Sequence, residues 1–296
     1  MHIRKYDRYY HAMLLPGVVL LLIFSVIPFL GNVIAFEKFV PAKGIFGSKW
    51  VGLQNFERLF RFMDFRQATL NTILISLSKM ALGILVPVFF ALVLNECARP
   101  RFKRTVQVVV YLPHFMSWVI LAVIFNNMFS STGIFNRFIV ALGGQSRLWM
   151  IDASAFRPIL VWTETWKDFG YGAIVYLAAI TAINPELYEA ADMDGATRLQ
   201  KIAHITLPSI VPTIILMATL SLRNVLNGGF DQVFNMYSPL VYSTGDIIDT
   251  YVYRMGLVNL QYSMSTAVSL IKSLIGFILI VVSYFAANRY AGYTIF

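Results

Sequence analysis

Charged residues are scarce in this sequence: 13% of its 296 residues are Asp, Glu, Lys or Arg, whereas 58% are hydrophobic. Soluble domains usually carry about a quarter charged residues. This shortage argues against a soluble all-α core and predicts an all-α integral membrane protein. Cysteine is nearly absent too: Cys97 is alone, which excludes an internal disulfide framework.

Motifs that carry catalytic or nucleotide chemistry are also missing. The sequence has no G-x4-G-K-[ST] phosphate loop, no G-x-G-x-x-G fingerprint and no H-E-x-x-H metal motif. Its four histidines, at positions 2, 11, 114 and 204, have no metal-ligand spacing. We therefore expect no enzyme activity, no cofactor and no metal in this chain. The net charge of +9 indicates membrane topology and not nucleic-acid binding, because Lys and Arg gather at membrane ends.

Six apolar runs are long enough to cross a bilayer, which takes about 20 mostly apolar residues. The predicted spans lie at about 12–36, 69–95, 105–129, 157–183, 208–227 and 266–287. The first contains Pro16 and Pro28, which predict kinks, and it is long enough to be a retained helix and not a removed signal peptide. We thus expect a single six-helix transmembrane domain over residues 1–296.

Basic residues set the expected orientation. The short loop after the second span carries Arg99, Arg101, Lys103 and Arg104, which predicts a cytoplasmic location. Both termini are then cytoplasmic, and 37–68, 130–156 and 228–265 are external. The loop 37–68 carries six basic residues against this rule. The alternation of spans and the denser charge of the shorter loop decide the orientation.

A polar segment at about 184–207 separates the fourth and fifth spans on the cytoplasmic side. Asn184 and Pro185 predict a helix start, and Gly195 predicts its end or a bend. A second short helix is predicted over about 197–205. Ala190 and Ala191 leave one side of the first helix open to a partner surface. A plain connector remains an alternative on these residues, because Ala and Glu are simply good helix formers.

A longer pattern runs through this segment. The positions that match E-A-A-x3-G-x9-I-x-L-P are Glu189, Ala190, Ala191, Gly195, Ile205, Leu207 and Pro208. The chain here resembles the permease subunits of binding-protein-dependent ABC importers, whose cytoplasmic loop has this signature. The stretches 71–76, 111–120, 178–214 and 249–257 are similar to the carbohydrate-uptake branch. Within it, oligo- and polysaccharide permeases are most similar, including transporters of uronide chains such as alginate.

The resemblance implies a type I ABC importer fold in a bacterial cytoplasmic (inner) membrane. It implies two ATP-binding subunits, which bind ATP and Mg, and a coupling helix that docks onto one of them. The expected coupling residues are Glu189, Ala190, Ala191, Asp194, Gly195, Leu207 and Pro208. It also implies an external solute-binding protein that delivers a saccharide, and a second, non-identical permease subunit.

Charges inside spans are candidates for a substrate pathway, because they are expensive in a membrane. Lys79, Arg223 and Lys272 lie on three different spans, and uncompensated cations there would attract an acidic saccharide. The alternative is that each cation pairs with an acid of this chain. The plausible partners are Glu164, Asp168 and Asp231. In the fourth span, Lys167 is expected to neutralise one of the two acids Glu164 and Asp168.

Aromatic and amide side chains complete the expected pathway. The aromatic candidates for stacking on sugar faces are Trp162, Trp166, Phe230 and Tyr237. The alternative is that these residues belong to the aromatic belt at the membrane interface and contact no ligand. Gly228 and Gly229 predict a broken helix whose polar groups face a cavity. The polar candidates there are Asn224, Asn227 and Asp231, with an ordinary polar helix end as the alternative.

Two other functional classes compete with an ABC permease. An ion-gradient-driven secondary sugar transporter would usually show inverted repeats or more spans, and it would leave the loop signature unexplained. A membrane-embedded enzyme is the third class, and the sequence offers no catalytic constellation for it.

Overall fold

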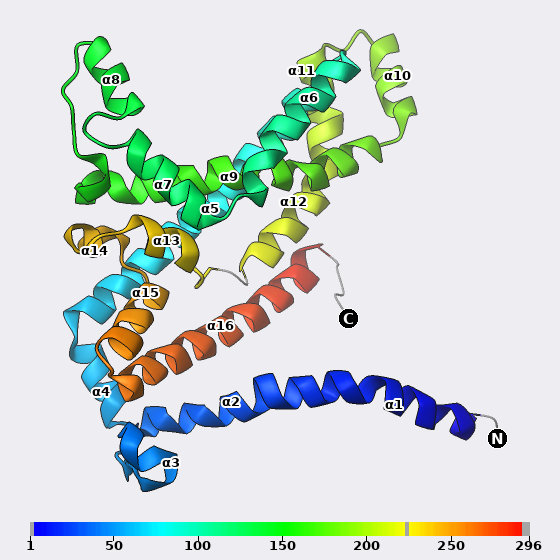
Figure 1. Cartoon of the computed structure of the whole chain (residues 1–296). Helices are drawn as coiled ribbons and strands as arrows, with labels where there is room; N and C mark the ends of the chain where they lie inside the picture. The colour runs from blue at the N-terminus through cyan, green and yellow to red at the C-terminus, as the bar shows by residue number, and fades with distance from the viewer. Residues whose placement is uncertain (1–2, 223–224, 292–296) are drawn as a thin grey trace. The chain divides into compact units, whose positions relative to one another are not determined.

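The computed structural model describes residues 3–222 and 225–291, and it divides into two compact units (Figure 1). We name Met1–Met63 with Tyr251–Ser273 the N-terminal unit, and Asp64–Thr250 with Leu274–Phe296 the central unit. The sequence predicts that the two units form one domain over residues 1–296, and this stays a prediction.

The N-terminal unit begins with a long helical run followed by a small hairpin. Its helical elements are α1 (Ile3–Leu21), the π-helix η1 (Leu22–Val26), α2 (Ile27–Leu30), the 3-10 helices η2 (Gly31–Phe36) and η3 (Pro41–Lys43), α3 (Gly44–Gly47), α4 (Gln54–Arg61), the π-helix η8 (Arg254–Val258) and the first part of α16 (Tyr262–Ala291). Strands β1 (Glu37–Lys38) and β2 (Lys49–Trp50) pair antiparallel, with Glu37 opposite Trp50. The buried Asn55 ties α4 to this hairpin, because its amide donates to the carbonyls of Ala35 (2.8 Å) and Glu37 (2.9 Å).

The first predicted span matches a continuous helical run. Tyr9–Phe36 is 28 residues long and apolar enough to cross a membrane. The run widens into the π-helix Leu22–Val26 just before Pro28. Pro28 has no N–H to donate to the carbonyl four residues earlier, which is a common reason for such local rearrangement.

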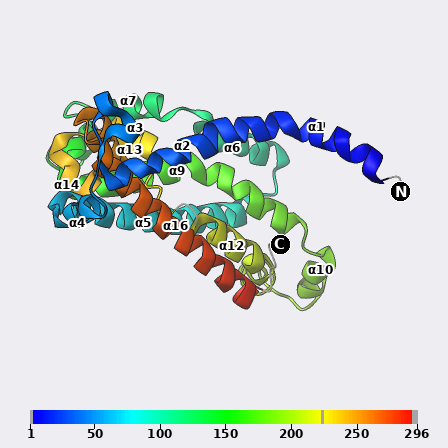
Figure 2. The same ribbon diagram turned by 90° about the horizontal axis from the view of Figure 1, so that it is seen from below.

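The central unit is built from long helices joined by short ones. Its elements are α5 (Met63–Asn95), α6 (Pro100–Tyr111), η4 (Leu112–Phe115), α7 (Trp118–Met128), α8 (Ile134–Ala141), η5 (Trp149–Ile151), α9 (Ala153–Thr181), α10 (Pro185–Met193), α11 (Arg198–Lys201), the π-helix η6 (Ile202–Thr206), α12 (Leu207–Leu222), α13 (Phe230–Met236), η7 (Pro239–Val241), α14 (Tyr242–Gly245), and, at the boundary between units, α15 (Ile248–Tyr253). Helix α10 lies at an extremity of this unit in both views (Figures 1 and 2).

Two apolar clusters hold α5 and α9 in place within the central unit. The first joins α5, α7, α9 and α13 around Ile75, Phe125 and Leu160. The second joins α5, α9 and α12 around Ala91, Tyr176 and Ile210. Helix α6 approaches α9 closely, because a Cβ added at Gly170 would lie 2.4 Å from the carbonyl oxygen of Val110. Burial of this apolar surface fixes the polar side chains that α5 and α9 carry between the two clusters.

The third predicted span is wrong as a single helix. Residues 105–129 do not form one straight rod, because Pro100–Phe115 and Trp118–Met128 meet at a bend of 103°. The break contains Pro113, and Ser117 caps the new helix by accepting from the N–H of Ile120 (3.4 Å). Proline removes a backbone donor and a serine N-cap starts a new helix, so the two residues together separate α6 from α7.

The described residues provide four helices that are both long and apolar enough to span, or five if the bent pair is one span. Helix α9 is long enough, with 29 residues, but it carries Arg157, Glu164, Lys167 and Asp168. The fold is the all-α membrane architecture expected, and the count of six spans stays a prediction that depends on α9.

Candidate functional site

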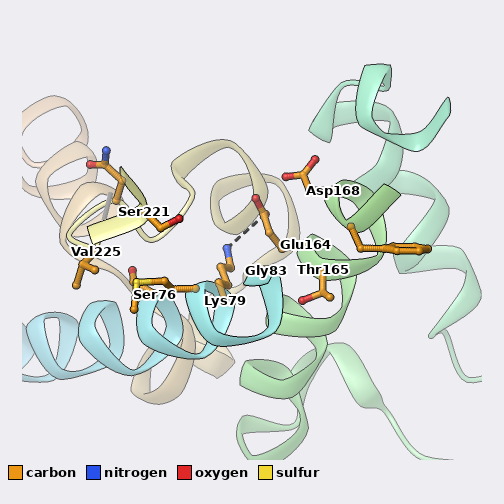
Figure 3. A pocket seen from close by; sticks show the side chains of 11 residues that line it. Ser76, Lys79, Gly83, Glu164, Thr165, Asp168, Ser221 and Val225 are labelled. Atoms are coloured by element: carbon orange, nitrogen blue, oxygen red, sulfur yellow. Dashed lines mark hydrogen bonds and ion pairs between the residues drawn. The ribbon is translucent and has the colours of Figure 1, made fainter. Parts of the chain in front are cut away.

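A polar cavity of about 250 Å³ lies in the central unit between α5, α9 and the end of α12 (Figure 3). Its lining comes from α5 (Ser76, Lys79, Met80 and Gly83), from α9 (Glu164, Thr165, Asp168 and Phe169) and from the third segment (Ser221, Val225 and Asn227). Helical spacing explains the set, because residues three and four apart share one face of a helix.

Lys79 is the most heavily bonded residue of this cavity. Its side chain is only 11% exposed, and its ammonium lies 3.4 Å from Glu164 Oε2 and points toward it (Figure 3). The same nitrogen donates to the carbonyl of Gly228 (2.8 Å) and to Gln232 Oε1. Of the two alternatives for Lys79, the structure therefore shows the ion pair, and Lys79 is not an uncompensated cation. Its place in a substrate pathway stays a prediction.

Gln232 orients this lysine from α13. It is fully buried, and its amide nitrogen donates to the carbonyl of Leu160 (2.7 Å) and to Thr163 Oγ1 (2.8 Å). A carbonyl can only accept, so the nitrogen must face α9 and the amide oxygen must face Lys79. Gln232 was not among the residues singled out from the sequence. Its burial depends on contacts with α9, some seventy positions earlier in the chain.

The predicted helix break at Gly228-Gly229 is confirmed. Helix α12 ends at Leu222 and α13 begins at Phe230. Gly229 has φ +87°, and an added Cβ there would lie 2.8 Å from Lys79 Nζ. Glycine alone adopts this conformation without strain. The backbone carbonyl freed at the break is that of the buried Gly228, and it accepts a hydrogen bond from Lys79.

The second acid of α9 has a different partner. Asp168 Oδ1 lies 2.8 Å from His114 Nδ1 and 3.6 Å from Lys167 Nζ. Lys167 also donates to the carbonyl of His114 (2.8 Å), in the break between α6 and α7. The expected neutralisation by Lys167 thus falls on Asp168, while Glu164 pairs with Lys79.

The cavity suits hydroxyl groups better than carboxylates. Ser76 is buried, and its hydroxyl has no hydrogen-bond partner among the described residues. The charged lining consists of Lys79, Glu164 and Asp168, two acids and one base. Lys79 therefore does not make this cavity electropositive, and the electropositive pathway expected from Lys79, Arg223 and Lys272 together stays a prediction.

The other predicted pathway residues are dispersed. Asn227 lines the cavity, whereas Asp231 is exposed on α13 outside its lining. Lys272 belongs to the N-terminal unit. Arg223 and Asn224 lie outside the described residues.

The aromatic candidates do not line this cavity either. Trp162 lines a separate apolar cavity of about 430 Å³ with Phe129, Phe135 and Trp149. Trp166 packs edge-on against Phe125, with ring centres 5.6 Å apart. Phe230 and Tyr237 both belong to an aromatic row around Phe234.

The segment 184–208 forms a second candidate site, a helical hairpin. Asn184 caps α10 by accepting from the N–H of Glu186 (3.1 Å). Gly195 has φ +75°, and the N–H of Ala196 reaches back to the carbonyl of Ala191 (2.9 Å). This is the glycine-terminated helix end that the sequence predicts. Thr197 and Gln200 then cap α11 reciprocally.

Side-chain contacts tie the two arms of this hairpin together. Tyr188 of α10 hydrogen-bonds the buried Thr206 (2.9 Å between oxygens), and Lys201 Nζ lies 2.6 Å from Asp192 Oδ1. The second arm is continuous with the following span, because Arg198–Leu222 is one 25-residue helical run. The predicted span start at Leu207-Pro208 is therefore interior to this run, and the hairpin is joined directly to a membrane helix.

The hairpin presents an open surface in this chain. Glu189 and Ala190 are exposed, and Ala191, Asp194 and Gly195 border a hollow of about 390 Å³. Met193 and Leu199 are 89% and 78% exposed. Exposed large apolar side chains beside a hollow indicate a contact surface. The sequence analysis missed Met193, Leu199 and Lys201, although their positions between Glu189 and Pro208 were visible.

No three His, Cys, Asp or Glu side chains come together as metal ligands in residues 3–222 and 225–291.

Comparisons with known proteins agree with this architecture. A family model described as "Binding-protein-dependent transport system inner membrane component" matches residues 83–291. The polygalacturonan/rhamnogalacturonan transport system permease protein YteP of Bacillus subtilis is 41% identical over 286 residues, 96% of this chain and 88% of that protein. Protein LplB of the same organism is 40% identical over 287 residues, 97% of this chain and 90% of that protein.

A solved structure of a bacterial ABC transporter involved in the import of the acidic polysaccharide alginate superposes with a TM-score of 0.89, at 36% identity, over 97% of both chains. A second structure, of the alginate ABC transporter in complex with an alginate pentasaccharide-bound periplasmic protein, gives a TM-score of 0.88 at 36% identity and covers 97% of this chain and 96% of that one.

Proposed function

Because this chain belongs to the family of binding-protein-dependent transport system inner membrane components, and is a sugar ABC importer permease, we propose that its cargo is an acidic oligo- or polysaccharide. The observation that carries the proposal is a shared cargo chemistry. One similar permease is named for polygalacturonan and rhamnogalacturonan, and the similar structure imports alginate. Polygalacturonan is, like alginate, a polymer of uronic acid units with a carboxylate on each sugar.

The cavity around Lys79 binds the uncharged part of such a cargo in this proposal. Ser221 and Asn227, which line it, offer groups that hydrogen-bond sugar hydroxyls. Glu164 and Asp168 in the same lining would repel carboxylates, so recognition of the acidic groups has to come from elsewhere. Arg223 and Lys272 remain the candidates in this chain, together with residues of a second, non-identical permease subunit.

The hairpin 184–208 is the proposed docking element for an ATP-binding subunit. It is exposed and internally tied, and its second arm continues into a membrane helix. Movement of a docked partner would therefore move the second arm and α12 together as one rigid body. ATP and Mg bind the partner subunits in this scheme, and this chain hydrolyses nothing. The hairpin and both chain ends face the cytoplasm, and the external solute-binding protein acts at the opposite face.

The test is ATPase stimulation and uptake by the reconstituted complex with its binding protein. Oligogalacturonides are compared with the same oligosaccharides after methyl esterification, which removes the charge but keeps the sugar ring and its hydroxyls. We expect the acidic series to stimulate and be taken up, and the esterified series to be poor. Equal responses to both, or a response to neutral oligosaccharides alone, would contradict the acidic cargo. Glu189→Lys should abolish uptake while this chain still inserts into the membrane.

A further inference from the structure

A cluster of cations lies where α5 ends and α6 begins. Arg99, Arg101, Lys103 and Arg104 fall within six positions, and Glu96 is the one acid of residues 95–111. Among the described residues, none of these four cations has an acidic oxygen within 4.0 Å. Three of them, the arginines, are exposed. Membrane topology explains a positive charge at this end, but not its arrangement on the helix.

The arrangement is a stripe that changes from charged to apolar along α6. Arg101, Arg104, Thr105, Val108 and Val109 line one shallow groove of about 470 Å³. These positions recur every three or four residues, so they share one helix face. That face is exposed in this chain: Val108 and Val109 are 64% and 62% accessible.

The opposite side of α6 is already occupied. Val110 approaches the backbone of Gly170 on α9, and Val106 packs on the apolar cluster of α5, α9 and α12. The groove is therefore an outward surface that these helices leave uncovered.

The charges at the start of α6 lack compensation from their own helix. Arg101, Lys103 and Arg104 lie in the first turns of α6, which contain no acid. The first turn of a helix favours anions and disfavours cations. An external anion would relieve both the mutual repulsion of the cations and their unfavourable place on the helix.

We propose that this groove binds an anionic phospholipid of the leaflet that this end of α6 reaches. Arg101 and Arg104 hold the headgroup phosphate, and Val108 and Val109 contact the first part of an acyl chain. Val108 lies seven positions after Arg101, roughly 10 Å at the rise of an α-helix. This matches a ligand with a phosphate at one end and a hydrocarbon chain that continues from it.

The apolar half of the groove distinguishes a lipid from other anions. A free phosphate would use the arginines and leave Val108 and Val109 exposed. An acidic protein surface would have to reach Val108 and Val109, which lie in the candidate spanning pair Pro100–Phe115 and Trp118–Met128, where lipid is the surrounding phase. Basic pockets beside spanning helices are known to hold anionic headgroups.

The test is a titration of the purified transporter complex with phosphatidylglycerol, followed by native mass spectrometry of lipid adducts. Arg101→Gln/Arg104→Gln should weaken binding roughly 30-fold, about fivefold for each cation removed near an anionic surface. Phosphatidylcholine should bind equally weakly to both proteins. Val108→Asn, which leaves every cation in place, should also weaken phosphatidylglycerol binding.

The matched control is Arg58→Gln/Arg61→Gln on α4, which has the same residue type and spacing and is also exposed. It should leave phosphatidylglycerol binding unchanged. Arg101→Lys/Arg104→Lys should retain binding and serves if the glutamine variant fails to fold. Unchanged binding in the glutamine variant overturns the proposal. The proposal is also overturned if inorganic phosphate competes with phosphatidylglycerol at equal concentration. It is overturned as well if the glutamine variant loses a partner subunit but keeps its lipid adducts.

Discussion

Lys79 shows how one buried residue can combine charge, backbone and cavity. It neutralises Glu164 of α9, caps the carbonyl of Gly228 and contacts Gln232 of α13. We predict that Lys79→Met lowers stability by about 3–5 kcal/mol, because it leaves a largely buried carboxylate without a partner. Thermal melting of the detergent-solubilised complex measures the effect.

The double variant Lys79→Met/Glu164→Gln tests whether Lys79 serves to pair with Glu164 or to attract an acidic cargo. Removing both charges should recover most of the lost stability, as a thermodynamic cycle for a coupled pair requires. The matched control is Lys43→Met at an exposed position, which should leave the melting temperature unchanged. A Lys79→Met protein with normal melting that loses only acidic-saccharide uptake would contradict the pairing role.

Gly229 offers a sharper test of the same site. Its φ of +87° strains any residue with a Cβ, and an added Cβ would lie 2.8 Å from Lys79 Nζ, so the lysine would also have to shift. We predict that Gly229→Ala destabilises by at least about 1–2 kcal/mol, the strain of a left-handed conformation for a residue with a Cβ. Gly83→Ala lines the same cavity from inside α5, in open space, and should be neutral or stabilising by up to about 1 kcal/mol. Melting temperatures that fall equally in both variants would contradict this account.

At the scale of elements, the turn between α10 and α11 sets the shape of the hairpin. Nothing lies within 4 Å of a Cβ built at Gly195, so its φ of +75° is the sole obstacle to a side chain. Gly195→Val should strain this turn by about 1–2 kcal/mol and change the angle between the two arms. We predict that ATP hydrolysis by the complex then becomes uncoupled from uptake, which parallel assays on proteoliposomes detect.

Asparagine tolerates the left-handed conformation better than valine does, so Gly195→Asn should remain coupled. Both variants should insert into the membrane normally, because the turn lies outside the apolar spans. Normal uptake by Gly195→Val at normal expression would exclude the docking role of the hairpin.

At the scale of the whole molecule, this chain has large surfaces that it does not cover itself. Many of its apolar side chains are exposed, including Met193 and Leu199 at the hairpin. In a permease, such surfaces meet lipid or other subunits. We predict that affinity purification of this chain from its native membrane recovers an ATP-binding subunit and a second, non-identical permease.

Quantitative mass spectrometry of the purified material measures that composition. Two copies of this chain in place of a second permease would contradict the heteromeric pairing. Absence of any ATP-binding subunit, with uptake driven by an ion gradient, would favour a secondary transporter. Glu189→Lys is an internal control, since it should lose the ATP-binding subunit and keep the second permease.

The sequence by itself determined the class of protein, the hairpin and its turn. Apolar content and length predict spans without reference to contacts, and Asn184, Gly195 and the motif through Pro208 act through local backbone geometry. Such features depend on residues a few positions apart. The broken helix at Gly228-Gly229 was visible for the same reason.

Only the tertiary structure decided which charges meet. Lys79 and Glu164 are 85 positions apart, and Gln232 lies a further 68 beyond Glu164, so no local pattern pairs them. The bend between α6 and α7 is different, because Pro113 and Ser117 mark it locally, but the apolar composition of residues 105–129 favoured one continuous span. Electrostatic partners are set by how helices pack. An isolated cation in a sequence therefore supports both a ligand site and an ion pair until its neighbours are known.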